Sequence, residues 1–188
     1  MATTQPIRKK SDVRKFLNYL KNQNNPRNYV LAALGIHTAL RISDILNLSC
    51  NDVYDFNTGK VRKTITLTEQ KSGKTREIKL HKTVISALKS YYPQAVPGAP
   101  LIINPQTRKA ISRVQAYRII STAATKAGVN QKVSPHSMRK TYGYHSWKNG
   151  ISPAVIMKIY NHSTMSVTQI YLGVDQDDLN TAYAKLKF

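Results

Sequence analysis

Five side chains, widely separated along the chain, could together hold and attack a phosphodiester. They are Arg41, His136, Arg139, His162 and Tyr171. Guanidinium and imidazole groups bind and polarise phosphate oxygens, and a tyrosine hydroxyl can act as a nucleophile that forms a covalent intermediate. The combination predicts phosphoryl-transfer chemistry, although each residue taken alone has an ordinary structural interpretation.

The pair His136 and Arg139 is predicted to lie at the start of a helix. Ser134 and Pro135 form a helix-start pattern, and residues three apart share a helical face. The first turn of a helix has free N–H groups and the positive end of the helix dipole, which together favour an anion. For this pair alone, a histidine bonded to the backbone beside a surface arginine is an equally good interpretation.

Arg41 and Asp44 lie where an apolar helix is expected to give way to a shorter one. An arginine beside such apolar sequence needs a ligand or an acid as its partner. Asp44 is the obvious structural partner, and it could also orient groups around a ligand. His162 follows an expected helix end, and Tyr171 is one of eleven tyrosines, so a structural role competes for both.

A basic hairpin could bring a lysine to the same site. Segments 64–68 and 75–80 alternate apolar and polar residues, and Gly73 lies in the turn between them. Lys71 and Lys74 are the candidates in that turn, although turns are often basic for no other reason than solubility. A lysine there could protonate a leaving oxygen, because its pKa falls readily when the side chain is desolvated.

The composition points independently to a polyanionic partner. Of 188 residues, 29 are Lys or Arg and 9 are Asp or Glu, which gives a formal net charge of +20. Such a charge attracts nucleic acid through counterion release. The basic residues are spread over every segment rather than along one amphipathic helix, so nucleic acid is favoured over a membrane surface. Lys74, Arg76 and Lys140 are expected to contact it.

Other classes of site lack support in the sequence. Cys50 is the one cysteine, which excludes a disulfide within the chain and a cysteine-based zinc site. The histidines and carboxylates show no recognised metal-ligand spacing, and no Gly-rich phosphate loop is present. No signal-peptide pattern or membrane-spanning apolar run is found. We therefore expect a cytoplasmic protein with no metal, no nucleotide cofactor and no membrane partner.

The periodicity predicts a mainly helical α+β domain with one small antiparallel sheet, the hairpin above. At 41% apolar residues the chain can bury a core, and segment 29–40 is apolar nearly all round, which predicts a buried helix. A short strand is expected at 101–103. Helices are expected to begin near Ser11, Asn25, Ser43, Thr83, Ser112, Ser134, Ser152, Ser166 and Asp175.

The ordered residues resemble the tyrosine recombinase (phage integrase) family over nearly the whole chain. Residues 38–44 are similar to the first sequence box of that family, and residues 135–141 to its second. Residues 161–171 are similar to the third box, including the nine-residue step from His162 to Tyr171. No single box is specific, but the combination is.

Two further positions match the family, and one departs from it. Lys71 is the better match to the catalytic lysine that the family carries on a hairpin, and Asp44 matches an acidic position after the first arginine. The family usually has Leu-Gly before the histidine of the third box, where this chain has Tyr160 and Asn161.

The resemblance implies a site-specific recombinase that cleaves and rejoins double-stranded DNA through a 3′-phosphotyrosyl intermediate. Tyr171 would be the nucleophile, Lys71 would protonate the leaving 5′ oxygen, and the two arginines and two histidines would hold the phosphate. It also implies a catalytic domain over residues 11–188 after a tail of residues 1–10, without the family's N-terminal DNA-clamping domain. A homotetramer on DNA, within a prokaryotic or phage-infected cell, is the expected assembly.

Three other functions remain open from the sequence. A catalytically idle DNA-binding regulator on the same scaffold predicts binding without a covalent adduct. An enzyme similar to type IB topoisomerases predicts relaxation of supercoils without strand exchange. A general RNA-binding protein would leave the spacing of the five residues as coincidence.

Overall fold

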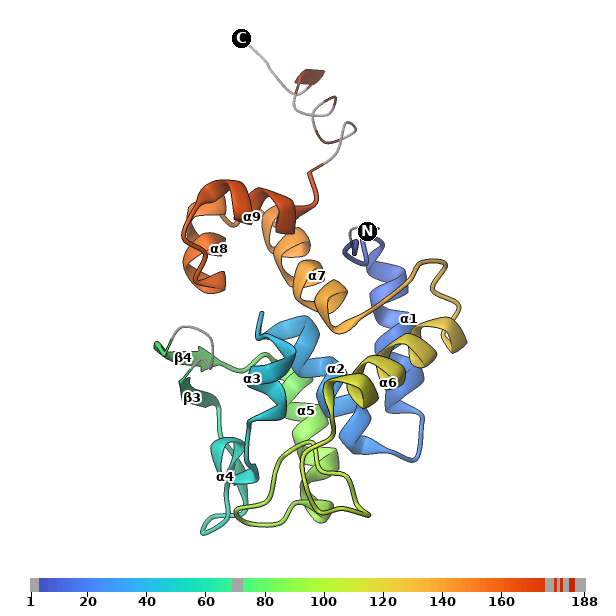
Figure 1. Ribbon diagram of the computed structural model, residues 1–188, viewed down its shortest axis with the longest axis vertical. Coiled ribbons are helices and arrows are strands. Elements are labelled where there is room, and N and C mark those ends of the chain that lie inside the picture. The colour runs from blue at the N-terminus through green and yellow to red at the C-terminus, as the bar shows by residue number, and fades with distance from the viewer. Residues whose placement is uncertain (1–3, 69–72, 175–177, 179, 181–182, 185–188) are drawn as a thin grey trace.

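The chain folds into a helical domain with two small antiparallel sheets (Figure 1), which confirms the predicted mainly helical α+β class. The computed structural model describes residues 4–68, 73–174, 178, 180, 183 and 184. The sequence predicts one of the two sheets. The other pairs β1 (Tyr54–Asp55) with β2 (Lys60–Val61), and strands of two residues are too short to produce an alternating pattern.

Helices make up most of the described chain. In sequence order they are α1 (Lys10–Lys21), α2 (Pro26–His37), α3 (Ile42–Leu46), α4 (Cys50–Val53), α5 (Lys82–Tyr91), a 3-10 turn (Tyr92–Gln94), α6 (Arg113–Lys126), α7 (Pro135–Lys148), α8 (Pro153–Tyr160) and α9 (Met165–Leu172). None of the helices in this part of the chain is long and apolar enough to span a membrane.

Helix α2 is the centre of the domain. Every residue from Tyr29 to Ile36 is buried, which confirms the predicted buried helix, and α2 packs against α1, α5 and α7. Its start is also as predicted: the side chain of Asn25 accepts a hydrogen bond from the backbone N–H of Asn28 at 3.3 Å, and Pro26 occupies the first position.

The serine caps of three later helices are confirmed. Ser112, Ser134 and Ser152 are the N-caps of α6, α7 and α8. In α6 the cap is reciprocal: Ser112 Oγ accepts from the N–H of Gln115 at 3.1 Å, and Gln115 Oε1 accepts from the N–H of Ser112 at 2.8 Å.

Four predicted helix starts are wrong by one or two residues, because several polar side chains near a helix end compete for the cap. The N-caps are Lys9 for α1, Arg41 for α3, His81 for α5 and Thr164 for α9. The predicted cap at Ser166 lies inside α9 instead. The helix expected from Asp175 falls mostly outside the described residues.

The strand expected at 101–103 is also wrong. Leu101 and Ile102 lie in a turn, and Ile103 forms an isolated bridge with Ala110. Both Leu101 and Ile102 are fully buried, so the apolar run reflects packing into the core rather than a strand.

The predicted β-hairpin is confirmed in its two arms. Strand β3 (Thr64–Thr68) pairs antiparallel with β4 (Thr75–Lys79), with Thr64 opposite Lys79 and Thr68 opposite Thr75. Gly73 has a φ of 66°, which glycine adopts without steric cost. The hairpin projects from the side of the domain below α8 in Figure 1.

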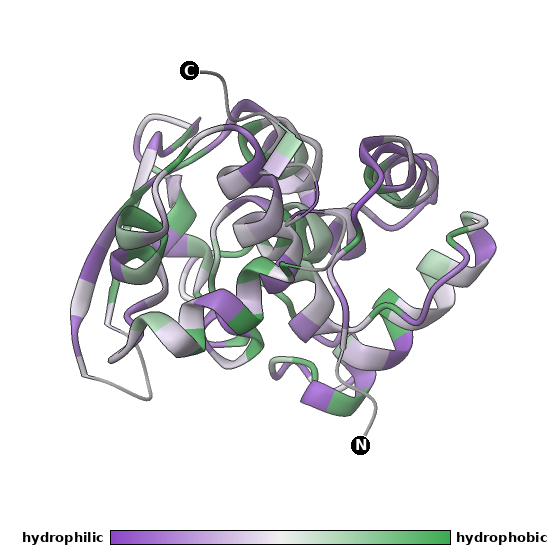
Figure 2. Ribbon diagram, turned by 90° about the horizontal axis from the view of Figure 1, so that it is seen from above, coloured by the Kyte–Doolittle hydropathy of each residue, from purple (hydrophilic) through white to green (hydrophobic). Residues whose placement is uncertain are grey.

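Two apolar clusters hold the domain together. The larger one joins α1, α2, α5 and α6. Figure 2 shows hydrophobic and hydrophilic residues interleaved along most of the ribbon. The smaller one consists of Ala39, Ile156, Tyr160 and Leu172, with Tyr171 packed against it. This second cluster ties α8 and α9 to the turn that follows α2.

Candidate active site

A tight turn between α2 and α3 joins the first predicted arginine to the second. Ala39 has a φ of 58°, a left-handed conformation that costs an alanine roughly 1–2 kcal/mol. Its carbonyl accepts a hydrogen bond from the guanidinium of Arg139, 100 residues later in the chain. Arg41 follows the turn directly as the N-cap of α3. The backbone conformation of one alanine therefore helps bring the two arginines to one place.

Arg139, in the second turn of α7, is held from several directions. Its side chain is 3% exposed, its Nη2 donates to the carbonyl of Tyr160 at 2.9 Å, and its guanidinium lies 4.5 Å from the centre of the Tyr160 ring. The Tyr160 hydroxyl in turn donates to the carbonyl of Arg139 at 2.5 Å. Among the described residues, the buried Nε of Arg139 has no hydrogen-bond partner. An oriented guanidinium with a spare donor suits an oxyanion ligand.

The arginines open onto a cavity of about 480 Å³ that also contains the predicted nucleophile. Its lining residues are Arg41, Ile42, Ser43, Arg113, Pro135, His136, Arg139 and Tyr171. Three of them are arginines and none is acidic. The cavity is thus built for a negatively charged ligand that can approach a tyrosine hydroxyl.

Both predicted histidines contact the ring of Tyr171, which is half-buried on α9. The ring centre lies 4.9 Å from that of His136, at an interplanar angle of 75°, and 4.6 Å from that of His162, at 61°. A hydrogen bond of 3.1 Å joins His162 Nδ1 to Thr168 Oγ1, which ties this imidazole to α9. Both imidazoles therefore lie beside the tyrosine, and histidine is the side chain that most often transfers protons near neutral pH.

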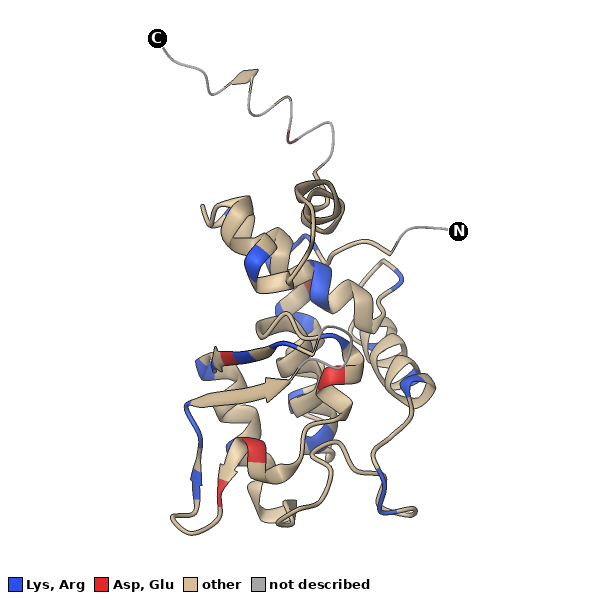
Figure 3. Cartoon of the chain, turned by 60° about the vertical axis from the view of Figure 1, so that its left-hand side comes forward, with Lys and Arg blue, Asp and Glu red and all other residues tan. Residues whose placement is uncertain are grey.

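The electrostatics of the cavity favour an anion. Burial, followed by the charge of Arg41, lowers the pKa of Arg139 to about 10. Desolvation, followed by the charges of Lys140 and Arg139, lowers the pKa of His136 below its ordinary value. Figure 3 shows Lys and Arg on most elements of the domain and Asp and Glu at few places. A bound phosphate would relieve this repulsion between neighbouring cations.

The turn before His162, where this chain departs from the family pattern, is left-handed at Asn161. Asn161 has φ 52° and ψ 47°, the left-handed conformation that asparagine adopts more readily than other side-chain-bearing residues. Its side-chain oxygen accepts a hydrogen bond from Lys74 Nζ at 3.2 Å. The β-hairpin therefore reaches the turn that carries His162. Lys71 lies outside the described residues.

The other predicted residues also lie around the cavity. The charge of Arg76, on β4, acts on Arg139. Asp44 is 3% exposed, and its carboxylate accepts a hydrogen bond from the backbone N–H of Arg41 at 3.3 Å, so it stabilises the start of α3. Lys140 is 4% exposed, and its ammonium lies 5.7 Å from the centre of the Tyr171 ring.

The sequence analysis missed two residues of the site. Arg113 occupies the first position of α6, where a cation is unfavourable because it faces the positive end of the helix dipole. An arginine directly after the predicted cap Ser112 is therefore a sequence signal for a bound anion, and Arg113 lines the cavity. Tyr160 is buried and bonded to Arg139, which lies 21 residues away in the sequence. No local pattern reveals such a contact.

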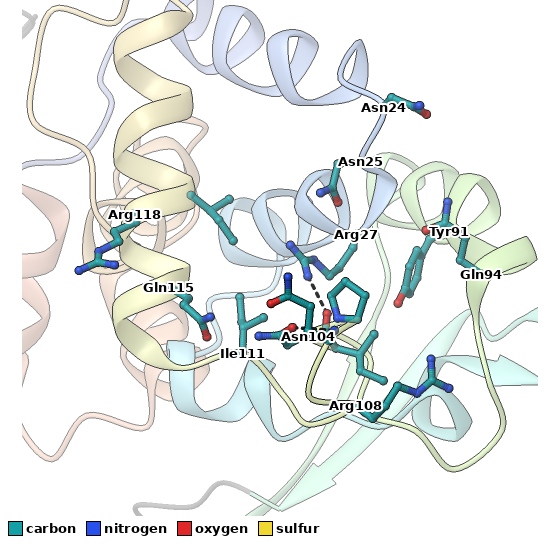
Figure 4. A pocket seen from close by; sticks show the side chains of 14 residues that line it. Asn24, Asn25, Arg27, Tyr91, Gln94, Asn104, Arg108, Ile111, Gln115 and Arg118 are labelled. Atoms are coloured by element: carbon teal, nitrogen blue, oxygen red, sulfur yellow. Dashed lines mark hydrogen bonds between the residues drawn. The ribbon is translucent and has the colours of Figure 1, made fainter.

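A second polar cavity, of about 630 Å³, lies between the start of α2, the loop at 103–111 and the first half of α6 (Figure 4). Arg27, Arg108 and Arg118 line it together with several amide side chains, and Arg27 Nη1 donates to the carbonyl of Ile103 at 2.6 Å. None of the predicted reacting residues lies there, so it is not the candidate active site. Within the described residues, no three His, Cys, Asp or Glu side chains gather as a metal site.

Comparison of the sequence with protein families gives a match to the "Phage integrase family" over residues 8–177. The probable integrase/recombinase YoeC of Bacillus subtilis is 37% identical over 183 residues, which cover 97% of both chains. Tyrosine recombinase XerA of Pyrococcus furiosus is 29% identical over 175 residues, or 91% of this chain. The match spans 58% of that longer protein and 56% of a TnP I resolvase from Bacillus thuringiensis.

Comparison of the fold with solved structures gives concordant results. A crystal structure of XerA recombinase superposes with a TM-score of 0.80 at 22% identity, covering 99% of this chain and 68% of that one. A post-cleavage complex of XerH recombinase with palindromic difH substrate gives 0.77 at 20% identity, covering 98% and 54%. The catalytic domain of bacteriophage HP1 integrase gives 0.62 at 20% identity, covering 96% and 95%.

Proposed function

Because the chain belongs to the phage integrase family, we propose that it is a site-specific DNA recombinase that cleaves and rejoins strands through a covalent 3′-phosphotyrosyl intermediate. One observation supports this most strongly: the ring of Tyr171 shares an acid-free cavity with Arg41, Arg113 and Arg139. A phosphodiester is the anion that this combination of nucleophile and cations fits. The relatives named above as recombinases and integrases agree with it.

In the proposed cleavage step, the Tyr171 oxygen attacks phosphorus and the bond to the 5′ oxygen breaks. Arg41 and Arg139 hold the non-bridging oxygens and stabilise the charge that develops in the transition state. His136 and His162 add hydrogen bonds, and His136 takes the tyrosine proton. We assign protonation of the leaving 5′ oxygen to Lys71, on the basis of the family resemblance alone.

Rejoining is the reverse reaction with the 5′ hydroxyl of another strand. The phosphotyrosyl ester preserves the energy of the broken linkage, so the proposed reaction consumes no ATP. Since the proton transfers are assigned to side chains, the scheme uses no metal ion.

We propose that the substrate is double-stranded DNA, bound as a homotetramer within the cytoplasm of a prokaryotic or phage-infected cell. A formal charge of +20 supports polyanion binding, and Lys74 and Arg76 on the hairpin are proposed backbone contacts. Relatives of similar fold, such as XerH, were solved on DNA. We assign residues 11–188 to one catalytic domain.

Trapping the intermediate tests this function. The protein is incubated with a library of nicked duplexes of random sequence. Cleavage near a nick releases a short fragment that carries the free 5′ hydroxyl, and because this fragment diffuses away, rejoining cannot occur. Denaturing electrophoresis then shows a protein–DNA band that disappears on protease treatment, and sequencing the trapped DNA gives the target site.

Tyr171→Phe should abolish this band and leave DNA binding nearly unchanged, because the substitution removes only the attacking oxygen. Tyr19→Phe, on α1 and outside the cavity, is the matched control and should retain the band. DNA binding by the wild-type protein without any covalent band would identify an idle regulator instead. Supercoil relaxation without exchange between two duplexes would identify a topoisomerase-like enzyme.

A further inference from the structure

Lys140 lies in an unusual environment for a lysine of a strongly basic protein. Its side chain is 4% exposed, although lysine is almost never fully buried unless it is paired. Among the described residues it forms no ion pair, and its ammonium lies 5.7 Å from the centre of the Tyr171 ring, within cation–π range. Such low exposure beside two predicted site residues distinguishes Lys140 from an ordinary surface lysine.

Two titratable groups of the active site lie beside this ammonium. His136 is one turn earlier on the same face of α7, and the charge of Lys140 is, after desolvation, the largest cause of the lowered pKa of His136. Tyr171 comes from α9, which packs against α7. A neighbouring cation disfavours a protonated imidazole. Lys140 therefore lies beside both the proposed proton acceptor and the proposed nucleophile.

Other charged groups also lie around α7. Arg139 donates to the carbonyls of Ala39 and Tyr160, and its guanidinium lies 5.8 Å from the centre of the Tyr171 ring. Arg8, in the segment that precedes α1, lies over the ring of Tyr144 and donates to the carbonyl of Gly173. Helices α2, α6 and α8 also pack on α7, but burial is the one cause of the lowered pKa of Lys140. Lys140 therefore lies beside His136 and Tyr171 together with Arg139.

We propose that Lys140 is a positioning residue for the nucleophile, whose ammonium, beside the Tyr171 ring, assists transfer of the tyrosine proton to His136 through its positive charge. This inference rests on the proposed DNA-cleaving function. In the step, the tyrosine oxygen bonds to phosphorus as its proton passes to His136. The bond to the 5′ oxygen breaks, and that oxygen takes a proton from Lys71. Lys140 keeps its own proton throughout.

Single-turnover cleavage of the trapped target duplex, measured from about pH 5.5 to about pH 9 around the ordinary histidine range, tests the proposal. Lys140→Met should slow cleavage at neutral pH by roughly 10- to 100-fold, because it removes a unit charge that lies 5.7 Å from the centre of the nucleophile's ring. The acid limb of the rate–pH profile should move to higher pH by roughly one unit, since His136 loses a cation that lowers its pKa. The deficit should therefore shrink at alkaline pH, and DNA affinity should match that of the control below.

Lys148→Met is the matched control on the same helix. Lys148 lies over the Trp147 ring and pairs with Asp178, so its removal takes away an equal charge without touching Tyr171. Its profile should coincide with that of the wild type. Lys140→Arg keeps the charge and should recover a large part of the lost rate. If Lys140→Met does not fold, Lys140→Gln carries the same prediction with a polar side chain of similar length.

A substrate with sulfur at the bridging 5′ position separates Lys140 from the general acid. A thiolate leaves without being protonated, since a thiol has a pKa of about 8.5. This substrate should restore cleavage to Lys71→Ala but not to Lys140→Met.

Three results would overturn the role of Lys140. The first is a slower Lys140→Met whose pH profile does not move, and the second is rescue of that variant by the sulfur substrate. The third is weaker DNA binding than Lys148→Met with a shallower salt dependence, which would make Lys140 a phosphate contact instead. A wild-type protein that forms no adduct would overturn the proposed function itself, because every variant is compared with it.

Discussion

Gly143→Ala tests whether the second layer of the site controls the position of Arg139. Gly143 lies inside α7, where replacing glycine by alanine normally stabilises a helix by roughly 0.5–1 kcal/mol. Here a Cβ atom would lie 2.3 Å from the hydroxyl oxygen of Tyr160 and 2.9 and 3.0 Å from two of its ring carbons. The tyrosine must move, or α8 must shift away from α7.

The steric cost should exceed the gain in helix propensity. Overpacking of a core costs roughly 1–3 kcal/mol. Displacing the Tyr160 ring also breaks its 2.5 Å hydrogen bond to the Arg139 carbonyl, and a buried hydroxyl left unpaired costs roughly another 1–3 kcal/mol. After the propensity gain is subtracted, we expect a net loss of about 1–5 kcal/mol in the free energy of unfolding, measured by urea denaturation.

Activity should fall more than stability explains. The Tyr160 ring supports the guanidinium of Arg139 at 4.5 Å, and its carbonyl holds Nη2 at 2.9 Å. A displacement of about 1 Å at a catalytic group can cost about 100-fold in rate. The rate of adduct formation, measured well below the unfolding transition, should fall by about that factor.

Gly35→Ala in α2 is the matched control. Its Cβ would also clash, at 2.4 Å, but with the terminal methyl of Met138, which can move because methionine is flexible. The loss there should stay below about 1 kcal/mol, with a correspondingly smaller effect on rate. If Gly143→Ala is as stable and as active as the wild type, the packing of Tyr160 does not govern Arg139 and the reasoning is wrong.

Three further outcomes are expected. Arg139→Lys should slow adduct formation by roughly 100-fold at nearly unchanged DNA affinity, because an ammonium cannot replace the planar fork of donors. Arg113→Ala should weaken DNA binding and reduce the slope of log K against log salt by about one, as measured by fluorescence anisotropy. Burial, followed by the charge of His81, lowers the pKa of His37 to about 4. As the pH falls, His37 therefore becomes protonated in the unfolded chain before it does so in the folded protein. Stability should therefore decline as pH falls from about 6.5 toward 4, by up to roughly 3 kcal/mol, and His37→Gln should flatten that decline in urea titrations.

The sequence by itself determined the local helices and strands and the types of side chain available to the site. Ser112, Ser134 and Ser152 mark the helix starts because capping is an interaction between neighbours in the chain. The alternation in β3 and β4 predicts the hairpin for the same reason. The types and order of Arg41, Arg139 and the other site residues predict phosphate chemistry because few side chains can perform it.

Only the tertiary structure decided how these side chains are brought together and oriented. The bond from Arg139 to the Ala39 carbonyl joins residues 100 apart, and the bonds between Arg139 and Tyr160 join residues 21 apart. Such contacts depend on how α7 packs against α2 and α8, which no local pattern specifies. The burial of Lys140 beside Tyr171 is of the same kind, because a lysine in the sequence reads as a surface charge until the packing of α7 and α9 encloses it.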